Sequence, residues 1–537
     1  MTGEKKQLVI LLLAAAVLFA LFPGSRDLWN PNEPIYGQAT REMIDNGTWL
    51  TPSINGKIFA EKPVLYYWMA RVASVLPGGP DEGNLRLPSA FTALLSTWLL
   101  YLLALPYVGH RRSIWSAALF ACTFAVFWGA RTIQMDILVL GGTLAVLVPL
   151  SRVADHGMPP LKGWLLAGAA AGLGFMGKGP VAWVLPALVF CTYALMTGRI
   201  GLLLNRYVLA GAGAALLVIA PWHLGIWLSG QGDILVEMYY RQNFTRFHNP
   251  WDHQSPWHYF IPYFFLDMAP WAFFVPLAFR LPGRDKNERR LDLMAWIYII
   301  GIIAFFSLSQ SKRSAYIMPV APAAAYLASG VLLRLRDGVL PTWRRRIAFV
   351  IFATAGLFMT LGGVAVLLKV IPEHPEFASA GYVLATVLTL GGLAVLAGAA
   401  VKGRVRYVTV ALASACAAVF LTGVLVVGPA VDPQKSARVF SSQVNELMAG
   451  GGNLYSYRFW DWRSGYTFYT GRMITNLKSE EALQDVWRQD RKAFLIVEER
   501  RVDEAWELLG GAEPVLVREI GSRTAYLFEN TTQQEER

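Results

Sequence analysis

Long apolar runs separated by short polar loops dominate the first 430 residues. A helix that crosses a membrane needs about 20 mostly apolar residues. Runs of this kind cover residues 7–24, 85–108, 113–130, 134–152, 163–177, 179–197, 207–228, 259–280, 291–309, 315–334, 346–370, 380–401 and 406–430. The pattern predicts a polytopic α-helical membrane protein with about 13 transmembrane helices. Only Lys178 and two glycines separate 163–177 from 179–197, so one long re-entrant element is the alternative there.

Basic residues are concentrated in alternate loops. If Lys5 and Lys6 lie in the cytoplasm and the runs alternate, every strongly basic short loop falls on the cytoplasmic side, as the positive-inside rule requires. These loops hold Arg111 and Arg112, Arg152 and Lys162, Arg199 and Arg206, and the segments 284–290, 334–346 and 402–406. We therefore expect a multi-pass protein of the cell (inner) membrane with a cytoplasmic N-terminus.

The other side of the membrane then receives three larger polar segments, 25–84, 229–258 and everything after 431. In the first, Pro34–Asn46 and Val64–Leu76 have the spacing of amphipathic helices, which we expect in the plane of the membrane surface. We assign residues 1–431 to the membrane domain, loop 25–84 included, and residues 432–537 to a soluble extracytoplasmic (periplasmic) α/β domain.

Helical and strand patterns alternate in that last domain. The helical patterns are Ala437–Met448, Glu480–Gln489 and Val502–Leu509, and the strand patterns are Ala493–Val497, Pro514–Val517 and Thr524–Phe528. The change from apolar runs to this mixture indicates a small domain outside the lipid.

Composition agrees with a membrane protein and excludes several functions. Of 537 residues, 55% are hydrophobic and 16% charged, against about 25% charged in soluble domains. The net charge of +11 is spread over short loops, which argues against nucleic-acid binding. Cys122, Cys191 and Cys416 lie in apolar runs, which excludes a disulfide framework and a thiolate metal site. The first run lacks a clear cleavage site before Arg26, so we interpret it as an uncleaved helix.

Two carboxylates on the outer side are candidates for proton transfer. Glu33 begins an amphipathic helix, and Asp136 begins an apolar run soon after Arg131. A carboxylate at such a position can also be an ordinary helix cap. Two of them beside lipid on one side of the membrane favour a functional site.

Cations on the same side could hold an anion. They are Lys62, Lys178, Arg246, Lys312 and Arg313. Lys178 lies between two glycines at a helix break, where backbone N–H groups could also meet a phosphate, although a lysine that only snorkels from a span end is the alternative. Lys312 and Arg313 run against the positive-inside trend, which favours a bound anion.

The outer face has no nucleotide supply, and the chain has no phosphate-binding loop of the nucleotide-binding kinds. A transfer there needs an activated group that is already attached to a lipid, such as a polyprenyl-phosphate sugar. It also needs a base for the acceptor hydroxyl and cations for the departing phosphate. Glu61 and His253 could in addition hold a divalent metal such as zinc, magnesium or manganese, although the flanking Trp251 and Trp257 favour an ordinary interfacial histidine at position 253.

Short ordered motifs carry a resemblance to a known family. The stretch from Trp29 to Met43 resembles W-x-P-D-E-x-x-Y-x-x-x-x-R-E-M, and Phe59–Pro63 resembles F-E-K-P. Met176–Gly179 resembles T-K-G, Asn243–Phe247 resembles x-x-x-R-F, and Lys312–Tyr316 resembles K-x-x-x-Y. In this order, across nearly the whole chain, they resemble the GT-C glycosyltransferases of the protein O-mannosyltransferase family, above all the bacterial aminoarabinose transferases that modify lipid A.

The resemblance implies roles for individual residues. Lys62, Lys178, Arg246, Lys312 and Tyr316 would bind the lipid phosphate, and Glu61 with His253 would hold the metal. The family's paired acidic motif is Asn32-Glu33 in this chain, and an amide cannot take up a proton at neutral pH. Either Glu33 or Asp136 is then the base, or the acceptor chemistry differs from that of the aminoarabinose branch.

We therefore expect an inverting membrane glycosyltransferase. It would move a sugar from a polyprenyl phosphate to a lipid A-like or other envelope acceptor. A protein O-glycosyltransferase and a surface-polysaccharide glycosyltransferase of the same fold remain alternatives. The alternative of another class is a polyprenyl-lipid transporter, which would use the same cations without breaking a bond.

Overall fold

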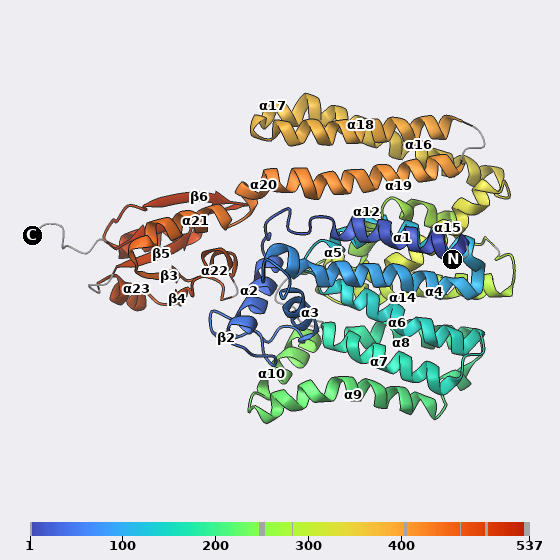
Figure 1. Ribbon diagram of the computed structural model, residues 1–537, viewed down its shortest axis with the longest axis horizontal. Coiled ribbons are helices and arrows are strands. Elements are labelled where there is room, and N and C mark those ends of the chain that lie inside the picture. Colours follow the sequence, from blue (N-terminus) through green and yellow to red (C-terminus); the bar gives the residue numbers. More distant parts are fainter. Residues whose placement is uncertain are drawn as a thin grey trace, which may run out of the picture.

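The computed structural model describes residues 3–245, 253–281, 283–401, 405–461, 463–488 and 492–530. Long helices lie side by side in a bundle, and a mixed α/β unit projects from one end of it (Figure 1). The N-terminal helix begins at the other end of the bundle. The molecule is therefore polar along its long axis, with different structures at its two ends.

The bundle contains helices that are long and apolar enough to cross a membrane. Among the described residues there are 8 such helices, or 9 if a pair bent by 106° counts as one span. They cover Glu82–Ala121, Asp136–Asp155, Tyr207–Leu228, Lys286–Leu308, Ser314–Arg336, Thr342–Glu373, Pro375–Ala400 and Val405–Lys435, and the bent pair is Trp257–Asp267 with Trp271–Ala278. The chain is thus a multi-pass membrane protein, and the figure of thirteen spans stays a prediction.

The remaining helices of the bundle are shorter or more polar. These helices are α1 (Gly3–Ala20), α5 (Phe124–Ala130), α7 (Pro160–Lys178) and α8 (Val181–Met196). The candidate spans and the bent pair named above contain α4 (Glu82–Ala121), α6 (Asp136–Asp155), α9 (Tyr207–Leu228), α12 (Phe260–Asp267), α13 (Val275–Ala278), α14 (Lys286–Leu308), α15 (Ala321–Arg336), α16 (Thr342–Ala365), α17 (Ile371–Glu373), α18 (Ala378–Ala400), α19 (Val405–Thr422) and α20 (Gly428–Lys435). Short connecting helices are η1 (Ile200–Leu202), α10 (Asp233–Val236), η2 (Glu237–Thr245), η3 (Trp257–Tyr259), η4 (Trp271–Phe274), η5 (Ser314–Val320), η6 (Val366–Val370), η7 (Pro375–Phe377) and η8 (Gly423–Val427).

Two glycines mark breaks that the apolar pattern indicated. Gly109 lies inside α4 with φ 69°, between the predicted spans 85–108 and 113–130. Gly179 has φ 74° and ends α7 directly after Lys178, and α8 begins at Val181. A positive φ is inexpensive only for glycine, so each glycine allows the chain to turn. Residues 163–197 therefore form two helices with a turn, and the single re-entrant element is not formed.

The segment 25–84 folds against the same end of the bundle as the α/β unit (Figure 1). It contains α2 (Asn32–Asp45), a hairpin of β1 (Ser53–Ile54) and β2 (Lys57–Ile58), and α3 (Leu65–Ala73). Both predicted helices are confirmed with shifted bounds. The aromatic side of α3 faces the protein, because Tyr66 and Tyr67 are fully buried.

The C-terminal part contains a five-stranded sheet in the order β4-β3-β5-β7-β6. Its strands are β3 (Asn453–Tyr457), β4 (Thr475–Leu477), β5 (Ala493–Glu498), β6 (Leu516–Ile520) and β7 (Arg523–Glu529). Its helices are α21 (Arg438–Leu447), η9 (Met448–Gly450), α22 (Gly465–Thr470), α23 (Glu480–Trp487), η10 (Glu499–Arg501) and α24 (Val502–Leu508). β3 pairs with β4 and β5 in parallel, and β7 pairs with β5 and β6 in antiparallel. All six elements predicted here are confirmed, whereas β3, β4 and α22 were not predicted.

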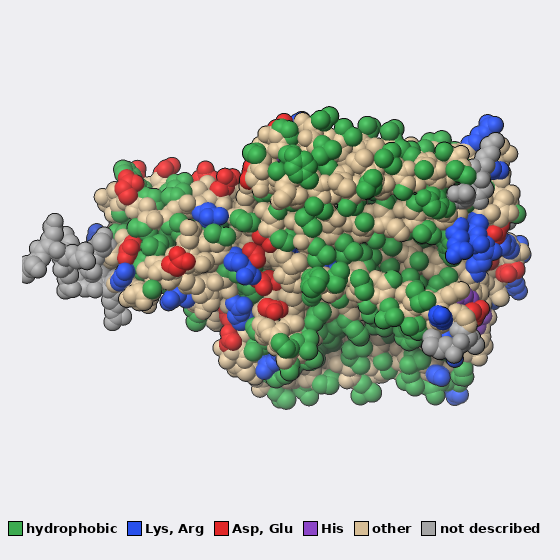
Figure 2. Space-filling model, turned by 45° about the horizontal axis from the view of Figure 1, so that its top comes forward, with side chains coloured by type: hydrophobic (Ala, Val, Ile, Leu, Met, Phe, Trp, Pro, Cys, Tyr) green, Lys and Arg blue, Asp and Glu red, His purple; other side chains and the backbone are tan. Residues whose placement is uncertain are grey.

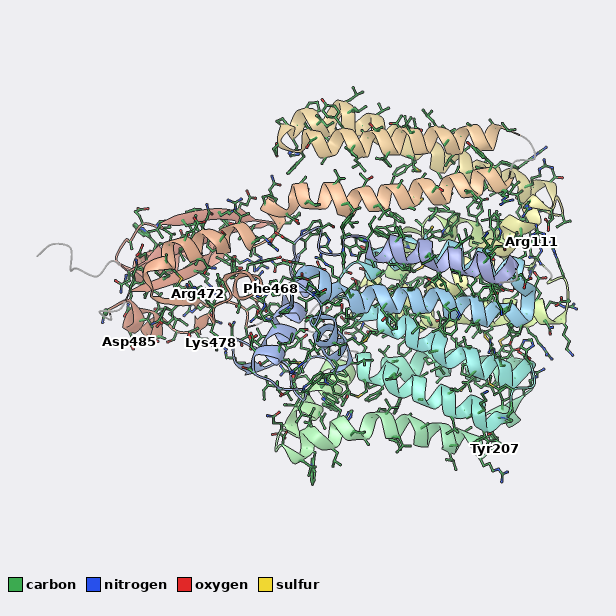
Figure 3. All side chains as sticks on the ribbon, viewed as in Figure 1. Arg111, Tyr207, Phe468, Arg472, Lys478 and Asp485 are labelled. Carbon is green, nitrogen blue, oxygen red and sulfur yellow. The ribbon has the colours of Figure 1, made fainter. Side chains whose placement is uncertain are left out.

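Polar contacts fasten the α/β unit to the segment 25–84. Arg438 on α21 forms an ion pair with Asp27 at 2.7 Å and also contacts Glu82. The indole N–H of Trp29 donates at 2.7 Å to Asp432 of α20, the bundle helix that leads into the unit. Arg41 lies over the ring of Phe468, 3.9 Å from its centroid; Phe468 is labelled in Figure 3. These contacts hold the unit over the end of the bundle where α2 and α3 lie.

Basic side chains gather at the opposite end of the bundle (Figure 2). Arg111, labelled there in Figure 3, forms an ion pair with Asp337 at 2.6 Å, and Arg284 joins the same carboxylate at 3.0 Å. These arginines come from loops that were predicted to be cytoplasmic. The basic loops and the α/β unit thus lie at opposite ends, which is the arrangement that the charge pattern predicts.

Candidate active site

A cavity of about 1290 Å³ opens at the end of the bundle that carries the α/β unit. Its wall is built by distant segments: the start of α2, the loop before α3, the starts of α6 and α8, η2, and the segment 309–319. Eight residues that were singled out from the sequence line it, namely Glu61, Lys62, Asp136, Lys178, His253, Lys312, Arg313 and Tyr316. The fold therefore brings most of the predicted site residues into one cavity.

Asp136, Lys178 and Tyr316 form the centre of this group. Asp136 is the first residue of α6, and its Oδ1 accepts a hydrogen bond from the ammonium of Lys178, the last residue of α7. The same ammonium lies 5.0 Å from the centroid of the Tyr316 ring. Side-chain exposure of Asp136 and Lys178 is only 15% and 16%, so the pair is largely shielded but still borders the cavity.

Helix geometry accounts for the position of this ion pair. The start of a helix favours a carboxylate and its end favours a cation, because the helix dipole is positive at the N-terminus. Asp136 and Lys178 occupy these two positions on neighbouring helices. Lys178 is thus held by a charge partner and an aromatic ring, and it is more than a lysine that only extends toward the membrane surface.

Lys312 organises another part of the cavity wall. Its ammonium donates to the carbonyl of Ser255 at 2.9 Å and also to the carbonyl of Ser309, and its backbone N–H donates to the carbonyl of His253 at 2.9 Å. The side chain is buried, with 4% exposure. Lys312 therefore fixes the short segment 253–255 against residues 309–312 while it keeps its charge at the cavity wall.

Glu61 and Lys62 enter the cavity from the loop that precedes α3. Lys62 donates from its ammonium to the carbonyl of Glu61 at 3.0 Å. Glu61 and His253 border the same cavity, but the described residues contain no group of three or more His, Cys, Asp or Glu that could enclose a metal ion. The protein thus offers two ligand groups, and this donor set fits a divalent ion only if bound substrate or water completes its coordination.

Glu33 lies outside the residues that line the cavity. It is 5% exposed and forms ion pairs with Arg26 at 2.7 Å and with Arg86 at 2.8 Å. The backbone N–H groups of Trp29 and Ile133 also donate to it, each at 3.2 Å. Burial raises the pKa of Glu33, but the two guanidinium groups outweigh burial and lower that pKa to about 2.

This environment makes Glu33 a poor proton acceptor. A carboxylate whose charge satisfies two buried arginines cannot be protonated without leaving both of them unpaired. Asn32, its neighbour in the acidic motif of the family, does line the cavity. The position that borders the cavity therefore carries an amide in this chain, and the carboxylate beside it faces the protein interior.

Arg131, like Glu33, binds groups of the protein itself and is not among the residues that line the cavity. Its guanidinium donates to the carbonyl of Leu21 at 2.7 Å and to that of Leu18 at 3.2 Å, at the C-terminal end of α1. Such carbonyls have no partner within the helix, and a cation satisfies them. The phosphate-binding prediction for Arg246 falls on a residue outside the described part of the chain.

Other cavity residues were missed by sequence reasoning. Tyr239 lines the cavity from η2, and its hydroxyl contacts the Nε2 atom of His223 at 2.8 Å. Trp460 and Asp461 reach the cavity from the loop after β3, so the α/β unit contributes to the site. A cluster of aromatic residues in a loop gave a weak signal for Tyr239. Nothing in the local pattern connected residues 460 and 461 with a cavity whose other lining residues lie between Pro31 and Pro319.

One part of the cavity is apolar. Its lining there comes from Val181 and Val184 of α8 and from Phe305 and Phe306 of α14. The ring of Phe306 lies 5.3 Å from that of Tyr316, so the apolar wall continues directly into the charged centre. A ligand with a phosphate and a long hydrocarbon chain matches both parts.

Comparison with known proteins agrees with this architecture. Residues 61–227 match the family described as dolichyl-phosphate-mannose-protein mannosyltransferase. The solved structure of ArnT from Cupriavidus metallidurans bound to undecaprenyl phosphate superposes with a TM-score of 0.80 over 98% of both chains, at 21% identity. The fold is therefore that of a GT-C membrane protein with a C-terminal α/β unit.

Curated relatives identify the family of this chain more closely. An undecaprenyl phosphate-alpha-4-amino-4-deoxy-L-arabinose arabinosyl transferase of Pseudomonas fluorescens strain Pf0-1 is 33% identical over 61% of this chain and 58% of its own length. A second, from strain Pf-5, is 32% identical over 70% of this chain and 68% of its own length. The chain belongs to this family of arabinosyl transferases. It spans about three fifths of the length of the first relatives that it matches, 58% and 61%.

Proposed function

We propose that this protein is an integral-membrane glycosyltransferase that moves 4-amino-4-deoxy-L-arabinose from undecaprenyl phosphate to lipid A or a similar envelope acceptor. The observation that carries the proposal is the Asp136–Lys178 ion pair in a cavity that is charged in one part and apolar in another. Family membership supports the sugar and the carrier, because the relatives are named for both.

The donor phosphate would bind to the cations that line the cavity. Lys62, Lys178 and Lys312 border it, and Tyr316 offers a hydroxyl beside Lys178. Positive charge around a departing phosphate stabilises the negative charge that develops on it, and this is worth more in a site shielded from water. The hydrocarbon chain would follow the apolar wall of α8 and α14. Arg246, outside the described residues, stays a proposed phosphate ligand.

The transfer would proceed as a single displacement at the anomeric carbon. The bond between this carbon and the phosphate oxygen breaks, and undecaprenyl phosphate leaves with the electron pair. The acceptor oxygen forms the new bond on the opposite face, which inverts the configuration, and its proton passes to a carboxylate. Asp136 is our candidate for that carboxylate, because it borders the cavity and Glu33 does not.

A divalent metal remains part of the proposal. Glu61 and His253 would be its protein ligands, and a bound zinc, magnesium or manganese ion would neutralise the donor phosphate further. Glu61→Gln should then lower the metal content of the purified protein, measured by elemental analysis, and chelation should lower the transfer rate. Equal metal content in the wild type and the variant would rule out this ligand set.

We also propose the orientation of the protein in the inner membrane. The cavity and the α/β unit would face the periplasm, and the basic loops would face the cytoplasm. An undecaprenyl-linked sugar is already activated, so a site on that side needs no nucleotide.

The direct test is a reaction of the purified protein with undecaprenyl phosphate-aminoarabinose and lipid A. The expected result is lipid A heavier by one pentosamine, measured by mass spectrometry, together with released undecaprenyl phosphate. Release of undecaprenyl phosphate without heavier lipid A would mean that water takes up the sugar and that lipid A is not the acceptor. If neither product forms with any envelope acceptor while the protein still binds the donor, a transporter replaces the transferase.

A further inference from the structure

A second cavity, of about 460 Å³, lies at the far end of α6 from Asp136. α6 has 20 residues, so the two cavities are separated by about 30 Å along it, at a rise of about 1.5 Å per residue. This distance matches the hydrocarbon thickness of a bilayer. The second cavity therefore lies at the level where the headgroups of the other leaflet are found, among loops that were predicted to be cytoplasmic.

Basic side chains dominate the charged part of its lining. Arg152 and His156 come from the end of α6, and Lys162 comes from the first turn of α7. Among the residues that the structure describes, neither Arg152 nor Lys162 forms an ion pair with a carboxylate. The Nε2 atom of His156 is buried and finds no hydrogen-bond partner within the described part of the chain.

The acidic residue nearest in sequence does not neutralise this cavity. The side chain of Asp155 is fully buried and forms ion pairs with Arg199 at 2.6 Å and Arg290 at 2.9 Å. The hydroxyls of Tyr107 and Tyr193 also donate to it, at 2.7 Å and 2.6 Å. None of these four partners lines the cavity, so the charge of Asp155 is balanced outside it, and Arg152 and Lys162 give the described lining a net positive charge.

The backbone shapes a rigid floor for the cavity. The carbonyl of Arg152 accepts from the N–H groups of His156 at 2.9 Å and Met158 at 3.1 Å. Gly157 between them has φ 69°, which lets the chain turn tightly. The residues around the cavity are thus held in place by main-chain hydrogen bonds.

Apolar surface adjoins the basic lining and distinguishes a lipid from a soluble anion. Leu105, Pro106 and Met158 line the cavity itself. Leu161, which precedes Lys162 in the chain, and Leu165, one turn further along α7, are 47% and 41% exposed. A soluble phosphate would use only the basic groups, whereas a phospholipid would place its phosphate on them and its acyl chains along these leucines.

We infer that this cavity binds the phosphate headgroup of an anionic phospholipid in the leaflet opposite the active site. Basic pockets between membrane helices on the cytoplasmic side recognise such headgroups through charge and apolar contact together. The site is separate from the proposed transfer reaction and shares no residue with the first cavity.

Native mass spectrometry of the full-length protein tests this inference with phosphatidylglycerol as the anionic lipid and phosphatidylcholine as the neutral one. The variant Arg152→Gln/Lys162→Gln should bind phosphatidylglycerol at least about tenfold more weakly than the wild type. Its binding of phosphatidylcholine should not change. The matched control is Arg345→Gln/Arg346→Gln, which removes the same charge from exposed residues near the start of α16.

The outcomes separate the possible ligands. The inference stands if only the first double variant loses phosphatidylglycerol and inorganic phosphate does not displace the lipid. If both double variants weaken the lipid equally, the effect is general surface charge and the inference is wrong. If millimolar inorganic phosphate competes fully, the site holds a free phosphate and the lipid assignment is wrong. An activity assay of the same variants confirms that they fold, because neither pair lines the first cavity.

Discussion

Glu33 and Asp136 carry the same charge near the same end of the bundle, but their surroundings differ. Glu33 is enclosed by Arg26, Arg86 and two backbone N–H groups. Asp136 instead forms an ion pair with a single lysine and borders the cavity. Sequence reasoning placed both carboxylates on the outer side and named both as possible bases. It could not separate them, because Arg26 and Arg86 reach Glu33 only in the folded protein.

At the residue scale, Asp136→Asn should abolish most of the transfer activity. The amide keeps the shape of the side chain but cannot take up a proton, and the loss of a general base costs about 100- to 10,000-fold in rate. The rate of pentosamine transfer to lipid A measures this effect. Thermal unfolding of the variant in detergent is the control. A variant that folds normally and keeps more than half of the wild-type rate would exclude Asp136 as the base.

Glu33→Gln should act on stability first. Removal of one partner from a buried ion-pair cluster costs about 3–5 kcal/mol, because it leaves buried charge uncompensated. The pKa of Glu33 is lowered to about 2 in the folded protein, so its stabilising contribution is complete above its ordinary pKa and is lost as the pH falls toward 2. The difference in unfolding temperature between wild type and variant should therefore be large at pH 7 and smaller at pH 3.5. An equal difference at both pH values would contradict the ion-pair account.

At the scale of elements, small residues determine how closely α7 and α9 pack against each other. A Cβ atom on Gly168 would lie 2.0 Å from the carbonyl oxygen of Gly211, closer than any real contact. Glycines allow membrane helices to approach each other closely, which replaces the hydrophobic driving force that is absent in lipid. The sequence placed both helices, but it could not say which glycines face a neighbour, because every face of these runs is apolar.

This contact predicts that Gly168→Val destabilises the protein markedly, by at least about 1–3 kcal/mol, the usual cost of overpacking. The matched control is Gly213→Val on α9, where a Cβ atom would meet nothing within 4 Å. Thermal unfolding in detergent should give a clearly lower midpoint for the first variant only. Equal midpoints for the two variants would show that α7 and α9 do not pack through Gly168.

The helices and strands of the α/β unit show how much of the fold local sequence patterns predict. Each helix and strand with a strong pattern was placed within a few residues of its observed bounds. β4 has only three residues, and its parallel partner β3 follows a run of glycines, so neither carried a pattern of useful length. The loop that brings Trp460 and Asp461 to the cavity depends on the docking of this unit, which no local pattern encodes.

At the scale of the whole molecule, charge is distributed along the axis of the bundle. The basic loops lie at one end, and the large cavity and the α/β unit lie at the other (Figures 1 and 2). The alternation of charge along the sequence anticipated this polarity, because the positive-inside rule acts on loops and does not require knowledge of packing. The closure of the cavity was not predictable in this way, since it joins eight separate stretches of the chain between Pro31 and Asp461.

This polarity predicts the topology in cells. Alkaline phosphatase, which is active only in the periplasm, should be active when fused after residue 530 and inactive when fused after Gly338, in the turn between α15 and α16. A green fluorescent protein fusion, which folds only in the cytoplasm, should give the reverse pattern. Active alkaline phosphatase at both positions, or only after Gly338, would contradict the proposed orientation.

The central claim is that distant charged residues hold the phosphate of the lipid donor in one cavity. A cryo-electron microscopy structure of the protein with undecaprenyl phosphate tests it most directly. We predict phosphate density between Lys62, Lys178 and Lys312, with the polyprenyl chain along Val184 and Phe305. Density for the phosphate outside this cavity, in a structure where the cavity itself is clear, would contradict the claim.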